Sequence, residues 1–372
     1  MTGTTISDRP RLREIPAHAH GRFRRDPLMW LLARGMDALN WIDGCFAFPE
    51  SGLGRPQQSF DVVVTHRQLV AQDETVVAVT FELPDGAELP PWRPGAHIDI
   101  EMPSGAARQY SLCGDPAERH RYRIAVRLVP NGRGGSTEVH RGLPVGSRVR
   151  IGLPRNAFPL AVGGYNQPTT AIRLIAGGIG ITPILPMLAV LEQVAMPWTM
   201  IYCGRTRDSM AFLPELRVYG DKVTVHCDDE AGAATPELLL GELVGSPAVY
   251  TCGPPPMLDA LRSAVDGRSD VEFHYERFSP APVVDGEEFE IHLARTGETL
   301  TVGAEQTALD AILAVRPDAT YSCQQGFCRS CAVRVVEGAP EHRSTALSPQ
   351  ELDAGYFLPC VSRAEGSLTV EL

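Results

Sequence analysis

Short apolar runs rich in β-branched residues begin near residue 58, and turn residues separate them at regular intervals. Such spacing predicts short antiparallel strands that pack into a barrel or a sandwich. We expect these strands at Asp61–Thr65, Val76–Leu83, His97–Glu101, Arg108–Leu112, Tyr122–Leu128 and Ser147–Ile151. The pattern indicates an antiparallel β-barrel domain over residues 58–165.

From about residue 170, strand-like runs alternate with stretches of helical periodicity. This alternation is typical of βαβ units, in which the strands form one parallel sheet. We expect strands at Ala171–Ala176, Trp198–Cys203, Lys222–Cys227, Ala248–Cys252 and Val271–Tyr275, and helices at Ile184–Val194, Pro236–Val244 and Pro256–Val265. The pattern predicts an α/β domain with a parallel sheet over residues 166–278.

A proline-rich linker at 279–286 leads into a third domain at 287–372. The runs Glu288–Leu293 and Glu298–Val302 predict a hairpin, and Ala308–Ala314 predicts a helix. The expected fold class is therefore multidomain, with a β-barrel, an α/β domain and an α+β domain in that order.

The segment before residue 58 has a different character. Proline, histidine and arginine dominate its first 25 residues, and leucines then recur at roughly helical spacing from Leu28 to Leu39, although Gly35 weakens the helical pattern. We interpret residues 1–57 as an N-terminal extension whose amphipathic helix packs on the body of the protein. A helix that docks a partner or lies on a membrane surface is the alternative.

Composition narrows the class of protein. A chain of 372 residues corresponds to two or three domains at roughly 150 residues each. Its 44% hydrophobic content excludes a disordered chain, and its net charge of −11 argues against nucleic-acid binding. No apolar stretch reaches about 18 residues and none stands at the N-terminus, so we expect a cytoplasmic protein without a transmembrane helix or signal peptide.

The charge is unevenly distributed along the chain. Residues 1–34 hold seven arginines and three acidic residues, a net of +4, whereas residues 287–372 hold thirteen acidic residues and six arginines, a net of −7. The acidic end suits a surface that meets a basic partner, and a solvated acidic surface explains the charge equally well.

Four cysteines carry the strongest local signal. The nine cysteines of the chain are an odd number, which argues against a secreted disulfide framework. Cys323, Cys328 and Cys331 follow the spacing C-x4-C-x2-C, and Cys360 lies 29 positions further on. This spacing matches the plant-type [2Fe–2S] pattern, and Gly326 lets the loop turn tightly. A four-cysteine zinc site and buried free thiols are the alternatives, although zinc sites favour paired C-x2-C units at both ends. We expect small buried side chains at Cys45, Cys113, Cys203 and Cys227.

Two loops predict a nucleotide site. The glycine-rich run Gly177–Gly180 lies between a predicted strand and a predicted helix, but Pro183 replaces the third glycine of G-x-G-x-x-G. Backbone amides in such a turn suit a pyrophosphate. A second loop, Cys252–Met257, also follows a strand, so both loops are expected to face one crevice at the carboxyl edge of the sheet. The small thiol of Cys252 would contact a nicotinamide ring without blocking hydride transfer.

The barrel carries two candidate flavin segments. Arg108, Tyr110 and Ser111 end a predicted strand and offer a cation, a flat aromatic face and a hydroxyl. Further along the chain, a turn at residues 131–136 opens a short predicted helix at Thr137–Arg141, and the free backbone amides of this turn suit a single phosphate group. Together these segments predict a flavin site.

The motifs and their order resemble the phthalate dioxygenase reductase family, within the wider ferredoxin–NADP reductase group, over about residues 58–372. The short single-phosphate loop resembles the FMN version of that group. The resemblance implies an FMN site at Arg108, Tyr110, Ser111, Ala125, Arg127, Arg133, Gly134, Gly135 and Ser136, with Phe278 near the flavin. It implies a nucleotide site at Gly178, Gly180, Thr182, Arg205, Asp208, Cys252, Gly253 and Pro254. It also implies cluster ligands at Cys323, Cys328, Cys331 and Cys360. Cys252 and Ser111 are the candidate catalytic residues.

The resemblance also implies a function. Electrons would pass from NADH through FMN and a [2Fe–2S] cluster to a separate terminal oxygenase, either a Rieske-type oxygenase or a cytochrome P450. NADPH stays open, because Arg205 or Arg207 could pair with a 2′-phosphate. We expect a monomer that binds no nucleic acid. The alternative is a zinc-stabilised, non-catalytic binding protein on a degenerate reductase fold, against which the three cofactor motifs weigh.

Two features depart from the family. Arg329 stands beside Cys328 where family members often have glycine, and it places a positive charge at the rim of the predicted cluster. This charge is expected to aid partner docking or to raise the cluster potential. The extension at 1–57 has no counterpart in the family core.

Overall fold

The computed structural model describes residues 59–130, 134–164, 168–279, 282–321, 324–326, 329–344 and 346–372. The predicted extension at 1–57 therefore lies outside the described residues. Within these ranges, no helix combines the length and apolar character needed to cross a bilayer.

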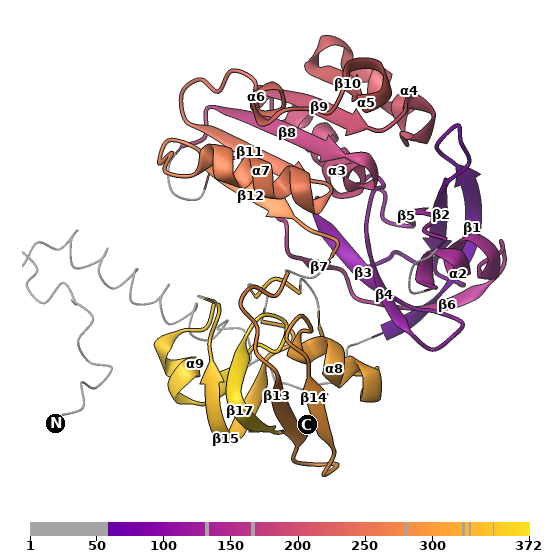
Figure 1. Cartoon of the computed structure of the whole chain (residues 1–372). Helices are drawn as coiled ribbons and strands as arrows, with labels where there is room; N and C mark the ends of the chain where they lie inside the picture. Colours follow the sequence, from indigo (N-terminus) through magenta and orange to yellow (C-terminus); the bar gives the residue numbers. More distant parts are fainter. Residues whose placement is uncertain are drawn as a thin grey trace, which may run out of the picture. The chain divides into compact units, whose positions relative to one another are not determined.

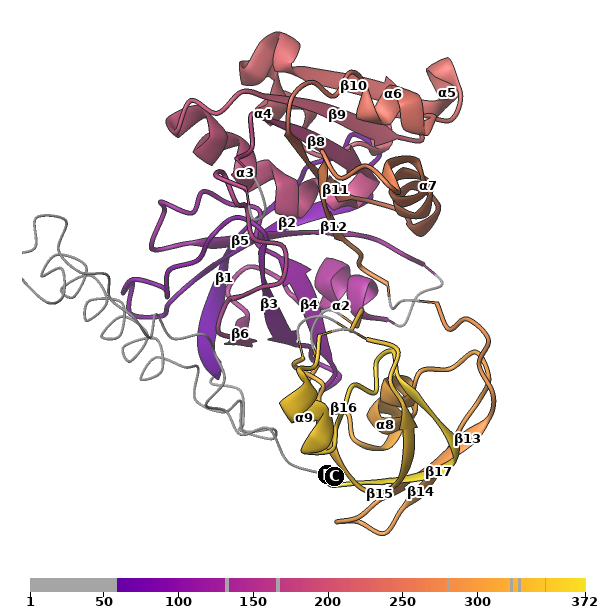
Figure 2. The same cartoon turned by 90° about the vertical axis from the view of Figure 1, so that its left-hand side faces the viewer.

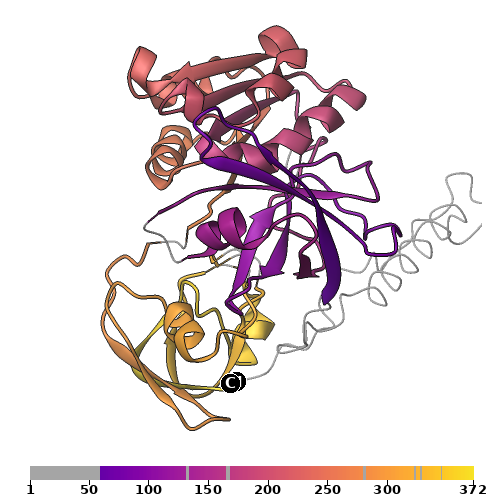
Figure 3. The ribbon, with the colours of Figure 1, turned by 90° about the vertical axis from the view of Figure 1, so that its right-hand side faces the viewer.

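Seven antiparallel strands form the first sheet, in the order β4-β3-β6-β1-β2-β5 with β7 paired to β3. A bridge between Leu112, just after β4, and Ile124 in β5 joins the two ends of this order, so the sheet closes into a barrel. Figures 2 and 3 show its bent strands from two sides. The strands are β1 (Ser59–Leu69), β2 (Val76–Glu82), β3 (Ala96–Glu101), β4 (Ala107–Ser111), β5 (Tyr122–Arg127), β6 (Arg148–Gly152) and β7 (Arg155–Asn156). The predicted barrel strands are confirmed.

The second sheet is parallel, with the order β10-β9-β8-β11-β12. Its strands are β8 (Ala171–Gly177), β9 (Trp198–Gly204), β10 (Val223–Cys227), β11 (Pro247–Cys252) and β12 (Glu272–Glu276). Helix α3 (Ile181–Gln193) packs on Leu174, whereas α7 (Pro255–Val265) packs on Ile175, so the two helices cover opposite faces (Figures 1 and 2). The predicted α/β alternation is confirmed.

One predicted helix is shorter than expected. We expected a helix at 236–244, but α6 (Pro236–Leu240) ends at Gly241. Gly241 has a φ of +60°, a conformation that glycine adopts easily and that ends a helix. Short helices not anticipated from the sequence connect the strands: η2 (Gly178–Gly180), η3 (Arg207–Ser209), α4 (Leu213–Leu216), η4 (Arg217–Lys222) and α5 (Asp228–Ala231).

A third sheet follows residue 286, with the order β14-β13-β17-β15-β16. The predicted hairpin is formed by β13 (Phe289–Leu293) and β14 (Thr299–Val302), and the predicted helix is α8 (Ala308–Val315). The sequence patterns did not reveal the remaining elements: β15 (Val333–Glu341), α9 (Pro349–Asp353), β16 (Tyr356–Phe357) and β17 (Arg363–Val370). This sheet with its two helices is an α+β body.

The buried cores are arranged unevenly among the three sheets. One cluster of buried residues joins the barrel, through Ala78, Ala125 and Phe158, to the parallel sheet, through Leu174 and Tyr250. The third sheet instead packs around its own cluster, drawn from residues after 288. The barrel and the parallel sheet thus share apolar packing that the third body does not enter.

Candidate functional site

The flavin segments meet in the structure. A Cβ atom built on Gly135 would lie 2.8 Å from Nε of Arg108, so the arginine side chain packs directly over this glycine. Gly134 has a φ of +83° and precedes helix α2 (Gly135–Gly142). The glycines therefore serve a tight turn and a close approach, and they bring the strand end and the helix N-terminus to one place.

The other flavin candidates lie on the same strand, on β5 and on helix α2. Burial raises the pKa of Tyr110 to about 12, with Arg108 acting in the opposite direction, so its phenol stays neutral. Ser111 is buried, and the hydroxyl of Ser136 accepts a hydrogen bond from the Val129 amide at 3.0 Å. Ala125 is buried, the guanidinium of Arg127 donates to the carbonyl of Ser209, and Arg133 lies outside the described residues.

The two predicted nucleotide loops touch at the carboxyl edge of the parallel sheet. A Cβ atom on Gly180 would lie 2.2 Å from the Cys252 carbonyl oxygen, and one on Gly177 would lie 2.6 Å from Cδ of Pro254. A Cβ atom on Gly253 would in turn lie 3.1 Å from the Cα of Gly177. These distances leave no room for side chains, so the glycines allow the two backbones to approach closely at this edge.

Gly178 and Thr182 complete the first loop. Gly178 has a φ of +54°, which glycine adopts without strain. The Thr182 hydroxyl donates to the Ile179 carbonyl at 3.0 Å, and the residue is only 2% exposed. Thr182 therefore fixes the turn that leads into α3.

Glu276 is a candidate that the sequence analysis missed. It ends β12 and is the register partner of Cys252 at the end of β11. Burial raises its pKa to about 8, and its Oε2 has no hydrogen-bond partner within the described residues. Burial, with a smaller contribution from Glu276, also raises the pKa of the Cys252 thiol. At neutral pH this pair is therefore an acid and a thiol that both hold their protons.

An acidic edge lies beside the ends of β9 and β10. Arg207 forms a two-pronged ion pair with Glu230, with both nitrogen–oxygen distances 3.1 Å. The carbonyl of Arg205 accepts from the Asp229 amide at 3.0 Å, and that of Asp208 accepts from the Asp73 amide at 3.0 Å. The predicted residues Arg205 and Asp208 thus lie at this edge, where Arg207 is already neutralised.

The cluster ligands are partly described. Cys331 and Cys360 are buried, whereas Cys323 and Cys328 lie outside the described residues. A Cβ atom on Gly326 would lie 2.7 Å from Cγ2 of Val361, so the loop packs against the segment that carries Cys360. The two segments that carry the predicted ligands therefore lie against each other, as a plant-type [2Fe–2S] site requires.

Positive φ angles mark this loop, which we call the cluster loop (residues 321–331). Gln324, Gly326 and Arg329 have φ angles of +54°, +79° and +61°. Left-handed conformations at these positions make sharp local turns of the backbone. Phe278, the predicted flavin neighbour, is 50% exposed at the exit from β12.

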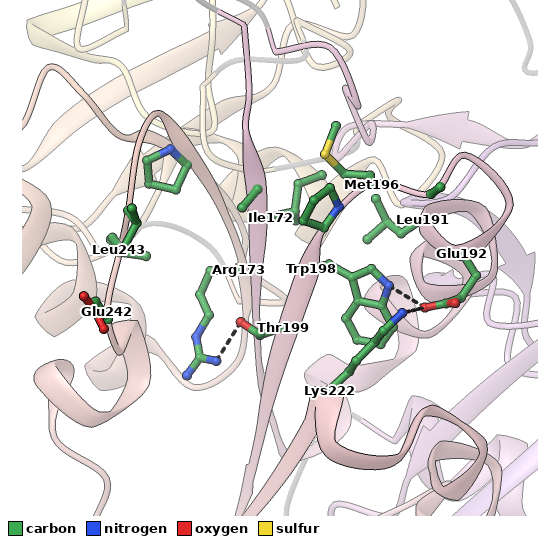
Figure 4. Close-up of a pocket in the computed structure, with 15 residues that line it drawn as sticks. Ile172, Arg173, Leu191, Glu192, Met196, Trp198, Thr199, Lys222, Glu242 and Leu243 are labelled. Atoms are coloured by element: carbon green, nitrogen blue, oxygen red, sulfur yellow. Dashed lines mark hydrogen bonds and ion pairs between the residues drawn. The ribbon is translucent and has the colours of Figure 1, made fainter.

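A cavity of about 590 Å³ lies at the opposite, amino-terminal edge of the parallel sheet, near Ala171 and Trp198 (Figure 4). Within its lining, Glu192 accepts from the Trp198 indole at 2.8 Å and also pairs with Lys222. The cavity is therefore separate from the nucleotide edge.

The arrangement defines a class of protein, a modular electron-transfer oxidoreductase with a barrel, a nucleotide-binding sheet and a ferredoxin-like body. Comparison with known proteins agrees. Residues 291–365 match the family model of the 2Fe-2S iron-sulfur cluster binding domain. This match covers all four predicted cluster cysteines.

Among curated proteins, the chain is 40% identical over 306 residues to phenoxybenzoate dioxygenase subunit beta of Ectopseudomonas oleovorans, covering 80% of this chain and 92% of the relative. It is 38% identical over 320 residues to vanillate O-demethylase oxidoreductase of Pseudomonas sp. (strain HR199 / DSM 7063), covering 83% and 98%. Both alignments span nearly all of the relative.

Solved structures give the same result. Phthalate dioxygenase reductase aligns with a TM-score of 0.62 and 30% identity over 84% of this chain and 98% of that one. An intact type IV self-sufficient cytochrome P450 monooxygenase aligns with a TM-score of 0.66 and 34% identity over 84% of this chain and 41% of that one. The chain belongs to the phthalate dioxygenase reductase family of oxygenase reductases, as the sequence predicted.

Proposed function

We propose that this protein takes electron pairs from NADH and delivers single electrons to a separate terminal oxygenase, with FMN and a [2Fe–2S] cluster as its cofactors. The observation that carries the proposal is the contact of Gly180 with Cys252, which joins two nucleotide loops in a chain that also holds a flavin turn and a cluster loop. When bound, FMN accepts the hydride and releases its electrons singly, which links two-electron to one-electron chemistry.

The barrel residues fit FMN. Arg108 and the amides of Gly134 and Gly135 offer a cation and a helix N-terminus to one phosphate group. The neutral phenol of Tyr110 offers a flat face to the ring, and the Ser111 hydroxyl lies at the adjacent strand end. The short loop suits a mononucleotide.

The nucleotide edge supports NADH. A 2′-phosphate would approach the carboxylates that follow β10, among them Asp229 and Glu230, and Arg207 is already engaged by Glu230. A free ribose diol would instead find acceptors there. Cys252 and the protonated Glu276 provide a neutral, buried floor beside the nicotinamide position.

The partner is proposed to be a terminal oxygenase, either a Rieske-type oxygenase or a cytochrome P450. The names of the relatives support this class, because they belong to dioxygenase, demethylase and P450 systems. The net charge of −7 at residues 287–372 favours a partner with a basic docking face.

Purified protein tests the proposal directly. We expect a brown-red sample with iron and acid-labile sulfide, FMN released on heating, and faster reduction of an artificial acceptor with NADH than with NADPH. A colourless sample that contains zinc would refute the proposal and support the zinc-stabilised binding protein. Release of FAD in place of FMN would overturn the mononucleotide assignment alone.

A further inference from the structure

The carbonyl oxygen of Tyr321 accepts hydrogen bonds from two side chains of the β-barrel. Gln109 Nε2 donates to it at 3.0 Å and Arg155 Nη1 donates to it at 3.2 Å. Tyr321 lies two positions before Cys323. The barrel therefore holds the backbone where the chain enters the cluster loop.

The Arg155 guanidinium is oriented before it reaches this carbonyl. Its Nη2 donates to Asp99 Oδ2 at 2.6 Å, and the two side chains are only 23% and 15% exposed. Asp99 and Gln109 are register partners on β3 and β4, and Arg155 is the register partner of His97 on β3. Burial, reinforced by the Arg155 charge, lowers the pKa of His97 to about 3, so the ring stays neutral beside the ion pair. A planar guanidinium held by one carboxylate presents its other nitrogen in a fixed direction.

Gln109 connects this contact to the flavin segment. It lies between Arg108 and Tyr110 on β4, and successive residues of a strand point to opposite faces. The same strand thus offers Arg108 and Tyr110 on one face, and Gln109 together with the flavin candidate Ser111 on the other.

These polar contacts affect the position of the cluster loop because the barrel and the ferredoxin-like body share no buried core. The barrel and the parallel sheet share a buried cluster, whereas the ferredoxin-like body has its own. A further hydrogen bond, from Gln325 Nε2 to the Arg277 carbonyl at 3.1 Å, joins the cluster loop to the exit from β12. Directional hydrogen bonds, rather than a common apolar core, set the position of the loop.

We propose that Gln109 and Arg155 are positioning residues for electron transfer from the flavin site to the cluster site, with Asp99 orienting Arg155. This inference rests on the proposed function. With both groups bound, each transfer would move one of the two electrons of the NADH hydride to the cluster, which would pass it on to the partner, and the single proton would go to solvent once both electrons have left. Electron tunnelling depends steeply on distance, so loosening the loop slows this step and leaves hydride transfer unchanged.

The test compares Arg155→Gln, Gln109→Ala and the double variant with Arg150→Gln as control. Arg150 lies on the same barrel in an exposed ion pair with Asp61. In anaerobic stopped-flow mixing with NADH, we expect flavin bleaching at the wild-type rate in all four variants. Cluster reduction in the double variant should slow by about tenfold or more. Arg155→Lys keeps the charge but cannot donate in two fixed directions at once. Its rate of cluster reduction should therefore lie between those of the wild type and Arg155→Gln.

Hydrogen exchange supplies a readout independent of turnover. Backbone amides around Tyr321 should exchange faster in the double variant than in Arg150→Gln. Wild-type cluster reduction in the double variant, or equal slowing of flavin bleaching and cluster reduction, would overturn the inference. If the double variant loses its flavin, the single variant Gln109→Ala, which removes one donor, is used in its place. Its rates of flavin bleaching and cluster reduction are then compared in the same way. Failure of NADH to bleach the wild-type flavin would refute the proposed function instead.

Discussion

Arg329 Nη1 donates to Glu351 Oε1 at 2.7 Å, from a backbone whose φ of +61° lies in the left-handed region. That region favours glycine, so an arginine there is strained. The arginine accepts the strain, and it gains an ion pair with helix α9 and a positive charge on the cluster loop.

Replacing this arginine should change the cluster more than the fold. In Arg329→Gly we expect a more negative cluster reduction potential, because a cation near the incoming electron is removed. Unfolding free energy should change by about 1 kcal/mol or less, since an exposed ion pair contributes little and the strain is relieved. Redox titration followed by electron paramagnetic resonance measures the potential. Arg334→Gln, which removes an arginine outside the cluster loop, is the control. A cluster potential in Arg329→Gly equal to that of the control would contradict the role assigned to the Arg329 charge.

Glu230 should control the choice between NADH and NADPH. Glu230→Ala frees Arg207 to meet a 2′-phosphate and removes one repelling carboxylate, so kcat/KM for NADPH should rise about tenfold. The value for NADH should change less. Asp270→Ala breaks a comparable ion pair with Arg268 elsewhere in the same domain and serves as control. An equal gain in kcat/KM for NADPH in both variants would contradict the role of Glu230 in selecting NADH.

Glu276 should make stability depend on pH in a defined direction. Its pKa is 4.5 as an ordinary glutamate and about 8 in the folded protein. Between these values the unfolded chain releases a proton that the folded chain retains, so stability falls as the pH rises from 4.5 to 8. Glu276→Gln removes this dependence, and we expect the variant to gain on the order of a few kcal/mol at pH 8 and little at pH 4. Denaturant unfolding at both pH values checks the sign; a gain of equal size at pH 4 would contradict it.

Arg363 should stabilise the ferredoxin-like body from within. It is 2% exposed, donates to the carbonyls of Gln306 at 2.8 Å and Gly303 at 3.0 Å, and stacks 5.0 Å from the Phe289 ring centroid. Arg363→Met leaves these carbonyls buried without a donor, at a cost of about 3 kcal/mol. Thermal unfolding followed by cluster absorbance should show the loss.

The control for that measurement is Arg316→Gln. Arg316 pairs with Asp318 at the protein surface, so its replacement should change stability by less than about 1 kcal/mol. Equal losses in the two variants would show that burial of Arg363 is not what matters.

Local patterns were sufficient for most of the fold. Alternation of β-branched residues predicted strands such as β2 and β8, and glycine at strand ends predicted the loops at 177–180 and 252–254. The helix at 236–244 was predicted too long, because apolar periodicity continues past Gly241 while the backbone does not. Periodicity reports burial, and a single left-handed glycine overrides it.

Residues whose role depends on another domain could not be found in the same way. Gln109 and Arg155 stand 46 positions apart and meet at Tyr321, far along the chain. Glu276 resembles an ordinary charged residue at a strand end until β11 places Cys252 beside it. No local spacing encodes these contacts, because they arise only when strands from distant segments pair.

The separate buried core of the ferredoxin-like body has a consequence for how this protein unfolds. Unfolding of residues after 288 would remove no residue from the buried cluster shared by the barrel and the parallel sheet. On the proposed function, such a protein would keep its flavin and nucleotide segments but lack the cluster that passes electrons to the partner. Because the two buried clusters share no residue, we expect this protein to unfold in more than one step.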